Sequence, residues 1–542
     1  MKKLFFLLGL IFLTGCKDTP ETEPEMVPEK EIDTLEKREY KVLDSKFIVN
    51  DSLWKPFEED LAGFSAEVYE EVKALVFEKS IPEIQEAVNS GKLTYEELAL
   101  FYLTRIMEYD RENELSLNSV ISLNPDLVKQ AREKDLQRKS SKNSHPIYGI
   151  PVLLKDNINT AGMPTTAGAE VLKNNKTKDA FIVKQLKANG ALILGKANLS
   201  EWAYFFCGDC PSGYSAIGGQ TLNPYGRKIH DTGGSSSGSG VAVAANLAPV
   251  AVGSETAGSI LSPSSSNSIV GLKPTIGLLS RGGIVPISGT LDTPGPMTRN
   301  VIDNAILLSA MTGVDNSDPA SGIAKKNNNS YLSGIQNSDI KGKRFGVFKS
   351  LLKDSLYVRA IADLEKAGAE IVEFEAEDIK LTNFVRLLNH DMKKDLPDYF
   401  KNYGGTSKVK NVQEIVDYNN LDSLKRAPYG QASFLGILKD SASSEEFRAI
   451  KDSLRLSGTK FLSEPMQHHN LDAIISINNS HAGFAAVAHY PAITVPMGYK
   501  SDNQPMGLTF IGKPLSEKEL LSFAYVFEKN SKRRKTPVNY NE

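Results

Sequence analysis

Short apolar runs alternate with amphipathic stretches along most of the chain. Runs typical of strands buried on both faces occur at residues 150–154, 191–194, 250–253, 344–348, 371–374, 473–477, 493–496 and 508–511. The stretches 179–189 and 357–367 instead place their apolar residues at helical spacing. Apolar strands that alternate with helices predict the α/β class, with a sheet covered by helices on both faces.

Two capping boxes mark the start of the first confident helices. Ser80 is followed three positions later by Glu83, and Thr94 by Glu97. In this arrangement each side chain satisfies a free backbone N–H at the helix start. Helices are therefore predicted to begin after Ser80 and after Thr94. The more polar stretch 379–464 is also predicted to be helical.

The first sixteen residues have the pattern of an export signal. Lys2 and Lys3 precede the apolar run 4–13, which is too short to span a bilayer. The run ends in LTGC at Cys16, which resembles a bacterial lipobox, where the cysteine becomes the lipidated mature N-terminus. Residues 1–16 are thus predicted to be a lipoprotein signal peptide, with ordinary cleavage after a small residue as the alternative.

The segment after the signal, residues 17–45, is acidic and proline-rich near its start and is predicted to be a disordered tether. Lipid chains on Cys16 would hold the exported protein on a membrane. The expected location is the cell envelope, on the periplasmic or the surface side of the outer membrane.

Composition narrows the function classes further. The chain has 542 residues, 41% of them hydrophobic, and a net charge of −3. A basic footprint is missing, so a nucleic-acid partner is not expected. No linker or repeat interrupts the stretch after residue 80, which favours one large domain.

The cysteine pair Cys207 and Cys210 leaves several interpretations open. Zinc needs about four ligands, and neither a second C-x-x-C nor a suitable histidine spacing accompanies the pair. In an oxidising compartment a local disulfide is the first choice, and free thiols come next. No metal ion and no organic cofactor are indicated.

Small residues crowd the stretch 233–266, where Ser235 and Ser259 lie 24 residues apart, each beside a glycine. An apolar run between them, VAVAANLAPVAVG, must be buried, which argues against a flexible linker. A serine hydroxyl becomes a nucleophile when a base removes its proton, and backbone N–H groups in a tight turn can stabilise the oxyanion. The turn 255–259 could supply such donors, and no G-x-S-x-G elbow is present here.

These segments resemble the amidase signature family of Ser–cis-Ser–Lys hydrolases. The resemblance rests on GGSSSGSG, GSETAGSI, VGLKPTIGLLSRGGIVPIS, LDTPGPM and GIPVLLKDNI, and it extends from about residue 80 to the C-terminus. It implies a single large domain over 70–537 with a mixed, many-stranded sheet between helices. It also implies hydrolysis of carboxamide C–N bonds. The helical, variable segment 379–464 is the part least like the family pattern and is expected to form part of the substrate entrance.

By motif position, Lys155 would be the base, Ser235 the bridging residue after a cis peptide from Gly234, and Ser259 the nucleophile. A base must be neutral, and the apolar run before Lys155 predicts the burial that lowers a lysine pKa. An ion pair with the adjacent Asp156 is the alternative for that lysine. Ser236 would either support the hydrogen-bond network or cap a helix backbone.

The resemblance assigns the oxyanion hole to the backbone N–H groups of Thr256, Ala257, Gly258 and Ser259. Ala257 replaces the Gly or Asp of many members, and it would strain the turn if positive φ were required there. Leu261 replaces a common arginine, which argues against substrates whose carboxylate that arginine would bind. Glu255 is expected to bind backbone donors.

Within the family, GKANLSEWA, YSAIGGQTLNPY and GGIVPISGTLDTPGPM resemble bacterial peptide amidases, which implies small-molecule or peptide amides as substrates. Two alternatives remain. One is a catalytically silent surface binding protein with the same fold. The other is a glutaminase-like subunit of an amidotransferase, which export through a lipobox disfavours.

Overall fold

The computed structural model describes residues 35–111, 113–138, 145–326 and 331–541. One mixed sheet of eleven strands runs through this part of the chain, in the order β1-β3-β2-β6-β8-β7-β12-β13-β11-β9-β10. Its strands are β1 (Val120–Leu123), β2 (Pro151–Lys155), β3 (Leu192–Ala197), β6 (Val250–Glu255), β7 (Val270–Lys273), β8 (Thr293–Thr298), β9 (Arg344–Phe348), β10 (Glu370–Phe374), β11 (Ala473–Ile477), β12 (Ala492–Tyr499) and β13 (Pro505–Ile511). Strands β4 (Tyr214–Ser215) and β5 (Gly219–Gln220) form a separate ribbon.

The sheet combines two parallel groups with antiparallel neighbours. Strand β2 runs parallel to both β3 and β6, and β9 runs parallel to β10 and β11. The pairs around β8, β7, β12 and β13 are antiparallel. All the strands predicted from apolar runs are present, so the predicted mixed α/β sheet is confirmed.

Three further strands, β1, β7 and β8, have no uniform apolar run. Strand β8 carries Pro294 and Pro296, although it lies inside the sheet between β6 and β7. Proline cannot donate to a ladder and usually argues against a central strand. The sequence pattern therefore could not identify this strand.

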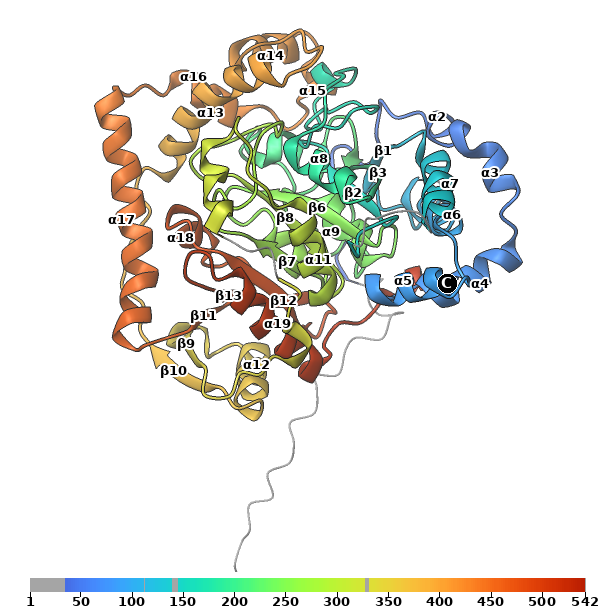
Figure 1. The fold of residues 1–542 in the computed structure, drawn as a ribbon. Coiled ribbons are helices and arrows are strands. Elements are labelled where there is room, and N and C mark those ends of the chain that lie inside the picture. The colour runs from blue at the N-terminus through green and yellow to red at the C-terminus, as the bar shows by residue number, and fades with distance from the viewer. Residues whose placement is uncertain (1–34, 112, 139–144, 327–330, 542) are drawn as a thin grey trace, which may run out of the picture.

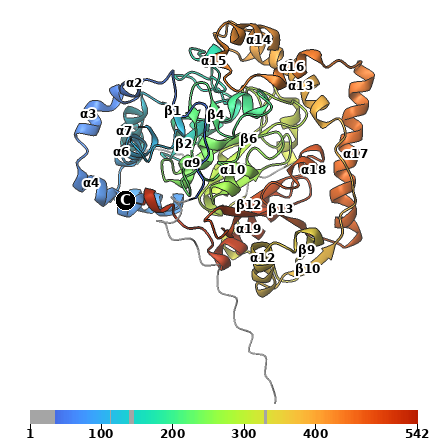
Figure 2. The ribbon, with the colours of Figure 1, turned by 180° about the vertical axis from the view of Figure 1, so that it is seen from behind.

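Helices flank the sheet in Figure 1, and the view from behind in Figure 2 shows helices on that side as well. Helices α9, α10, α11 and α19 pack directly on the strands. The helices are α2 (Asn50–Trp54), α3 (Glu58–Ala62), α4 (Ala66–Val76), α5 (Ile81–Asn89), α6 (Tyr95–Ile106), α7 (Leu127–Gln137), α8 (Phe181–Ala188), α9 (Ser237–Ala244), α10 (Leu261–Ser266), α11 (Val301–Met311), α12 (Ser355–Lys366), α13 (Phe384–Asn402), α14 (Val412–Asn420), α15 (Ser423–Arg426), α16 (Ala432–Lys439), α17 (Ser444–His468), α18 (Ala482–Val487) and α19 (Glu517–Ser531). In the described ranges, no helix is both long enough and apolar enough to cross a bilayer.

The predicted helix starts are confirmed by their hydrogen bonds. Ser80 N donates to Glu83 Oε2 at 2.8 Å, and α5 follows. Thr94 N donates to Glu97 Oε2 at 2.8 Å, and Glu97 N donates back to Thr94 Oγ1 at 3.1 Å. Residues 379–464 are largely helical, as expected, and α13, α14, α16 and α17 lie together along one border of the molecule (Figure 1).

The last part of the predicted tether belongs to the folded domain, which corrects the boundary at residue 45. Arg38 forms an ion pair with Asp231 at 2.9 Å, and Asp44 forms a β-bridge with Gly219. Composition missed these contacts because an ion pair and a backbone bridge to distant residues leave no pattern in the local sequence. The predicted signal peptide 1–16, Cys16 and the first part of the tether, residues 17–34, lie outside the described residues.

Candidate active site

The site lies where two adjacent parallel strands end. Strands β2 and β6 pair with Leu154 opposite Val252, so the next residue of β2, Lys155, lies beside the end of β6. The turn that follows β6 carries Ser259. Because parallel strands end at the same edge of a sheet, this pairing brings Lys155 near the turn that carries Ser259.

Lys155 is completely buried and is held by two oxygen atoms. Its Nζ donates to Ser235 Oγ at 2.7 Å and to the backbone oxygen of Ser254 at 3.0 Å. The adjacent Asp156 instead forms an ion pair with Lys196 at 3.1 Å, and both of these side chains are fully buried. The alternative of a Lys155–Asp156 ion pair is therefore wrong.

The surroundings of Lys155 favour its neutral form near neutral pH. Burial lowers the pKa of Lys155 to about 7, and the nearby carboxyl groups of Asp292 and Glu255 oppose this shift. A large fraction of the amine is then uncharged at pH 7 and can accept a proton. An exposed lysine would keep its ordinary pKa of about 10.4 and would be almost fully charged.

Ser235 and Ser236 connect the lysine to the turn. The peptide bond between Gly234 and Ser235 is cis, as the resemblance implied. Ser236 Oγ donates to Ser254 O at 3.1 Å and accepts from Ser254 N at 3.2 Å, while Ser236 N donates to Ser259 O at 3.2 Å. The Ser236 side chain does not cap α9, so of its two predicted roles the structure supports the network.

The turn after β6 places its positive φ on a glycine. Gly258 has a φ of 97°, and Ala257 is not among the positive-φ residues. The positive φ falls on Gly258 and not on Ala257, so the condition under which Ala257 would strain the turn is not met. Glu255 Oε2 accepts from Ile260 N at 2.7 Å and from Leu261 N at 3.0 Å, which confirms its expected binding of backbone donors.

Exposure differs between the three central residues. Lys155 and Ser235 are fully buried, whereas Ser259 is partly exposed. A buried amine and hydroxyl behind a partly exposed hydroxyl suit a substrate that approaches from the side of Ser259. Among the described residues, no group of three or more His, Cys, Asp and Glu side chains could hold a metal ion.

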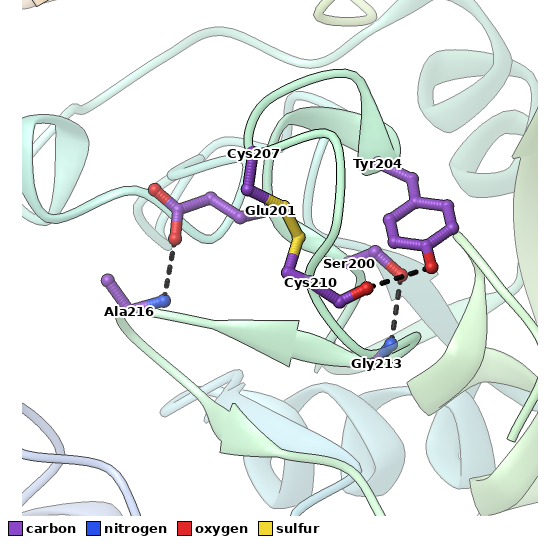
Figure 3. Close-up of a disulfide and its surroundings, with 7 residues drawn as sticks. All are labelled: Ser200, Glu201, Tyr204, Cys207, Cys210, Gly213 and Ala216. Atoms are coloured by element: carbon purple, nitrogen blue, oxygen red, sulfur yellow. Dashed lines mark hydrogen bonds between the residues drawn. A yellow bond between two sulfur atoms is a disulfide. The ribbon is translucent and has the colours of Figure 1, made fainter. Parts of the chain in front are cut away.

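A disulfide joins Cys207 and Cys210 in the loop between Ser200 and Gly213, the first choice among the interpretations of this pair (Figure 3). Tyr204 OH donates to the backbone oxygen of Cys210 at 2.9 Å, and Gly213 N donates to Ser200 Oγ at 2.9 Å. Ser200 N donates in turn to the backbone oxygen of Ser235 at 3.0 Å. The bridged loop thus contacts the backbone of the central serine.

Helix α13 links the helical segment 379–464 to the loops around the site. Tyr399 OH donates to Asn159 Oδ1 at 2.7 Å, just after β2, and Gly289 N donates to Asp395 Oδ2 at 2.6 Å, just before β8. The entrance role of this segment stays a prediction. Sequence analysis also missed Lys196 and Asp292, since nothing in their local sequence reveals partners that the fold brings close.

We predict that Lys196→Met lowers the free energy of unfolding by about 3–5 kcal/mol, because it leaves the Asp156 carboxylate buried without its cation. The matched control is Lys187→Met, which removes an exposed partner of Asp179 and should cost less than about 1 kcal/mol. Urea denaturation measures both. Equal losses in the two variants would contradict the importance of the buried pair.

Comparison with known proteins agrees with this architecture. The family model described as Amidase matches residues 97–476. A probable amidase of Arabidopsis thaliana is 35% identical over 481 residues, which cover 85% of this chain and 91% of that protein.

Two solved structures are also similar. An amidase family protein from Bacillus anthracis superposes with a TM-score of 0.87 at 38% identity, covering 93% of this chain and all of the other. The native peptide amidase from Stenotrophomonas maltophilia superposes with a TM-score of 0.80 at 38% identity, covering 85% of this chain and 98% of the other. With its matched family model, its relatives and its shared fold, the chain belongs to the amidase family and is an enzyme that hydrolyses amide C–N bonds.

Proposed function

We propose that this amidase hydrolyses carboxamides, peptide amides among them, through an acyl-enzyme on Ser259, with Lys155 as the base acting through Ser235. The observation that carries the proposal is the 2.7 Å hydrogen bond from the buried Lys155 Nζ to Ser235 Oγ. Lys155 forms no ion pair with a carboxylate of the described residues and has a lowered pKa, so it is suited to accept a proton.

In the first step, neutral Lys155 takes the proton of Ser235 Oγ while Ser235 takes the proton of Ser259 Oγ. Ser259 Oγ forms a bond to the substrate carbonyl carbon, and the carbonyl π electrons move to oxygen. The backbone N–H groups of Thr256, Ala257, Gly258 and Ser259 would stabilise this oxyanion. Gly234 and Ser236 support the arrangement through the cis peptide and the network around Ser254.

Collapse of the tetrahedral intermediate breaks the C–N bond. The proton held on Lys155 returns through Ser235 to the leaving nitrogen, so ammonia or an amine departs uncharged. Water then attacks the acyl-enzyme by the same proton path and releases the carboxylic acid. The base and the bridging hydroxyl thus do the work that a histidine does in other serine hydrolases.

The similarity to a peptide amidase supports peptide amides as one substrate class. Leu261, which stands where many members carry an arginine, supports substrates without a carboxylate at that position. We propose that the substrate entrance lies beside the helical segment 379–464, because α13 binds the loop after β2 and the loop before β8.

We further propose that the enzyme is exported and held on a membrane by lipid at Cys16, on the periplasmic or surface side of an outer membrane. The support is the LTGC pattern after a short apolar run. One acyl chain gives weak anchoring, so stable attachment needs more than one chain.

Ser259→Ala and Lys155→Met are each predicted to reduce ammonia release from a panel of peptide amides by at least about 10³-fold, because each removes a member of one proton path. Lys187→Met, a surface substitution, should retain full activity. A fluorophosphonate probe should label Ser259 of the wild type, as detected by mass spectrometry of the peptide.

Full activity in Ser259→Ala would contradict the acyl-enzyme assignment. Ammonia release from glutamine alone, with no release from peptide amides, would favour a glutaminase-like subunit. Absence of hydrolysis for every amide and ester, together with ligand binding that neither substitution changes, would favour a silent binding protein.

Cys16→Ala is predicted to abolish incorporation of labelled palmitate and to move the enzyme from the membrane fraction to the soluble fraction. The lost thiol is the only attachment point that the proposal provides. Cys207→Ser is the matched cysteine control and should leave lipid incorporation unchanged. Unchanged palmitate incorporation in Cys16→Ala would overturn the anchor.

A further inference from the structure

We propose that Asp292 is a positioning residue of this amidase, whose carboxylate holds the turn after β6 and sets the charge environment of Lys155. The inference rests on the proposed function, because it assigns Asp292 a role toward the proposed oxyanion donors and the proposed base. Asp292 does not touch the reacting atoms in this scheme and acts through the groups that it holds.

The carboxylate of Asp292 joins two loops. Its Oδ1 accepts from Thr256 Oγ1 at 2.5 Å, and its Oδ2 accepts from Ile287 N at 2.8 Å and from Ser288 N at 2.9 Å. Thr256 is the first residue of the turn that ends at Ser259. One side chain therefore fixes the start of the oxyanion turn against the loop at 287–288.

Strand pairing makes this contact possible. Asp292 directly precedes β8, and the first residue of β8, Thr293, pairs with Glu255, the last residue of β6. The next residues outward on the two strands are Asp292 and Thr256, which lie next to one another beyond the end of the ladder. A shift of this turn would displace the N–H groups that follow Thr256.

Asp292 also lines a small cavity beside the turn, together with Asn157, Ser254, Thr256 and Arg281. The backbone oxygen of Ser254 accepts the hydrogen bond from Lys155 Nζ. Asp292 and the residue whose backbone oxygen binds Lys155 therefore line the same cavity, and the charge of Asp292 acts on the base.

Charged groups around this contact come from several elements. Arg281 lies near Asp292 but is bound to Asp318 at 2.6 Å. On α13, Asp395 accepts from Gly289 N at 2.6 Å, and Asp391 accepts from Ser288 Oγ at 2.5 Å and pairs with Lys451 at 3.3 Å. The carboxylates of Asp292 and Glu255 both raise the pKa of Lys155.

The sign of the electrostatic effect follows from these neighbours. Ionised Asp292 raises the pKa of Lys155 against the larger lowering by burial. Loss of water around the carboxyl raises the pKa of Asp292 itself to about 6. Because Lys155 works as a neutral base, activity appears as pH rises through its pKa. Removing the negative charge lowers that pKa and moves the acidic limb of the rate profile to lower pH.

The test is Asp292→Asn, assayed as kcat and KM for a peptide amide across pH. The variant is expected to lose about 10- to 100-fold in kcat through misplacement of the turn, with a smaller change in KM. The acidic limb of its kcat/KM profile is expected to shift to lower pH. A purely structural role would lower kcat and leave that limb in place.

Two further variants sharpen the test. Thr256→Val removes the hydroxyl contact without changing charge, so kcat should fall while the limb stays. Asp303→Asn is the matched carboxyl control. The pKa of Asp303 is also raised to about 6 by burial, but its carboxylate accepts from Ile81 N at 2.8 Å and from Asn300 Nδ2 at 2.8 Å. It should leave the limb unchanged.

An unmoved limb in Asp292→Asn overturns the electrostatic role, and wild-type kcat in both Asp292→Asn and Thr256→Val overturns the positioning role. If Asp292→Asn does not fold, the kcat of Thr256→Val decides the positioning role. The Asp303→Asn control is not needed for that decision. Failure of the proposed function can be told apart from failure of this inference. If the proposed function is wrong, Ser259→Ala remains active, and the pH profiles of the Asp292 and Thr256 variants can still be measured.

Discussion

The exclusion of water from one amine is the constraint on which the rest of the site depends. Lys155 is completely buried at the end of β2 and is bound by a hydroxyl and a carbonyl oxygen, and no carboxylate of the described residues is in direct contact with it. Asp156, the adjacent candidate for an ion pair, is bound to Lys196. Because Asp156 is paired with Lys196, it does not stabilise the charged form of Lys155. The Lys155 amine can therefore lose its proton near neutral pH.

The sheet provides the precision that such a site needs. Parallel β2 and β6 bring Lys155 beside the turn to Ser259, and antiparallel β8 brings Asp292 beside Thr256. Gly253 of β6 allows a close approach, since a Cβ at that position would lie 2.9 Å from Ser236 Oγ. The reacting groups thus stand on the ends of rigid strands, and the loops around them are held by hydrogen bonds to α13 and to the disulfide-bridged segment.

Much of the architecture could be predicted because it depends on local signals. Apolar runs located most strands, capping boxes located α5 and α6, and ordered motifs pointed to Lys155 and Ser235 as neighbours. The spacing of Cys207 and Cys210 is compatible with a bridge between them.

What could not be predicted depends on partners that are distant in sequence. Strand β8 carries prolines and is recognisable only by its neighbours. The Asp156–Lys196 pair and the Thr256–Asp292 bond join residues about 40 positions apart, and local sequence does not encode them. Residue types alone do not tell whether the positive φ of the turn falls on Ala257 or on Gly258. The structure places it on Gly258.

The most direct test of this account is the protonation state of Lys155. In protein labelled with ¹³Cε-lysine, the resonance that disappears in Lys155→Met should titrate with a pKa of about 7, whereas exposed lysines titrate near 10.4. A Lys155 resonance that remains in its charged form up to pH 10 would contradict the account, because the enzyme would then have no neutral amine to start the proton transfer.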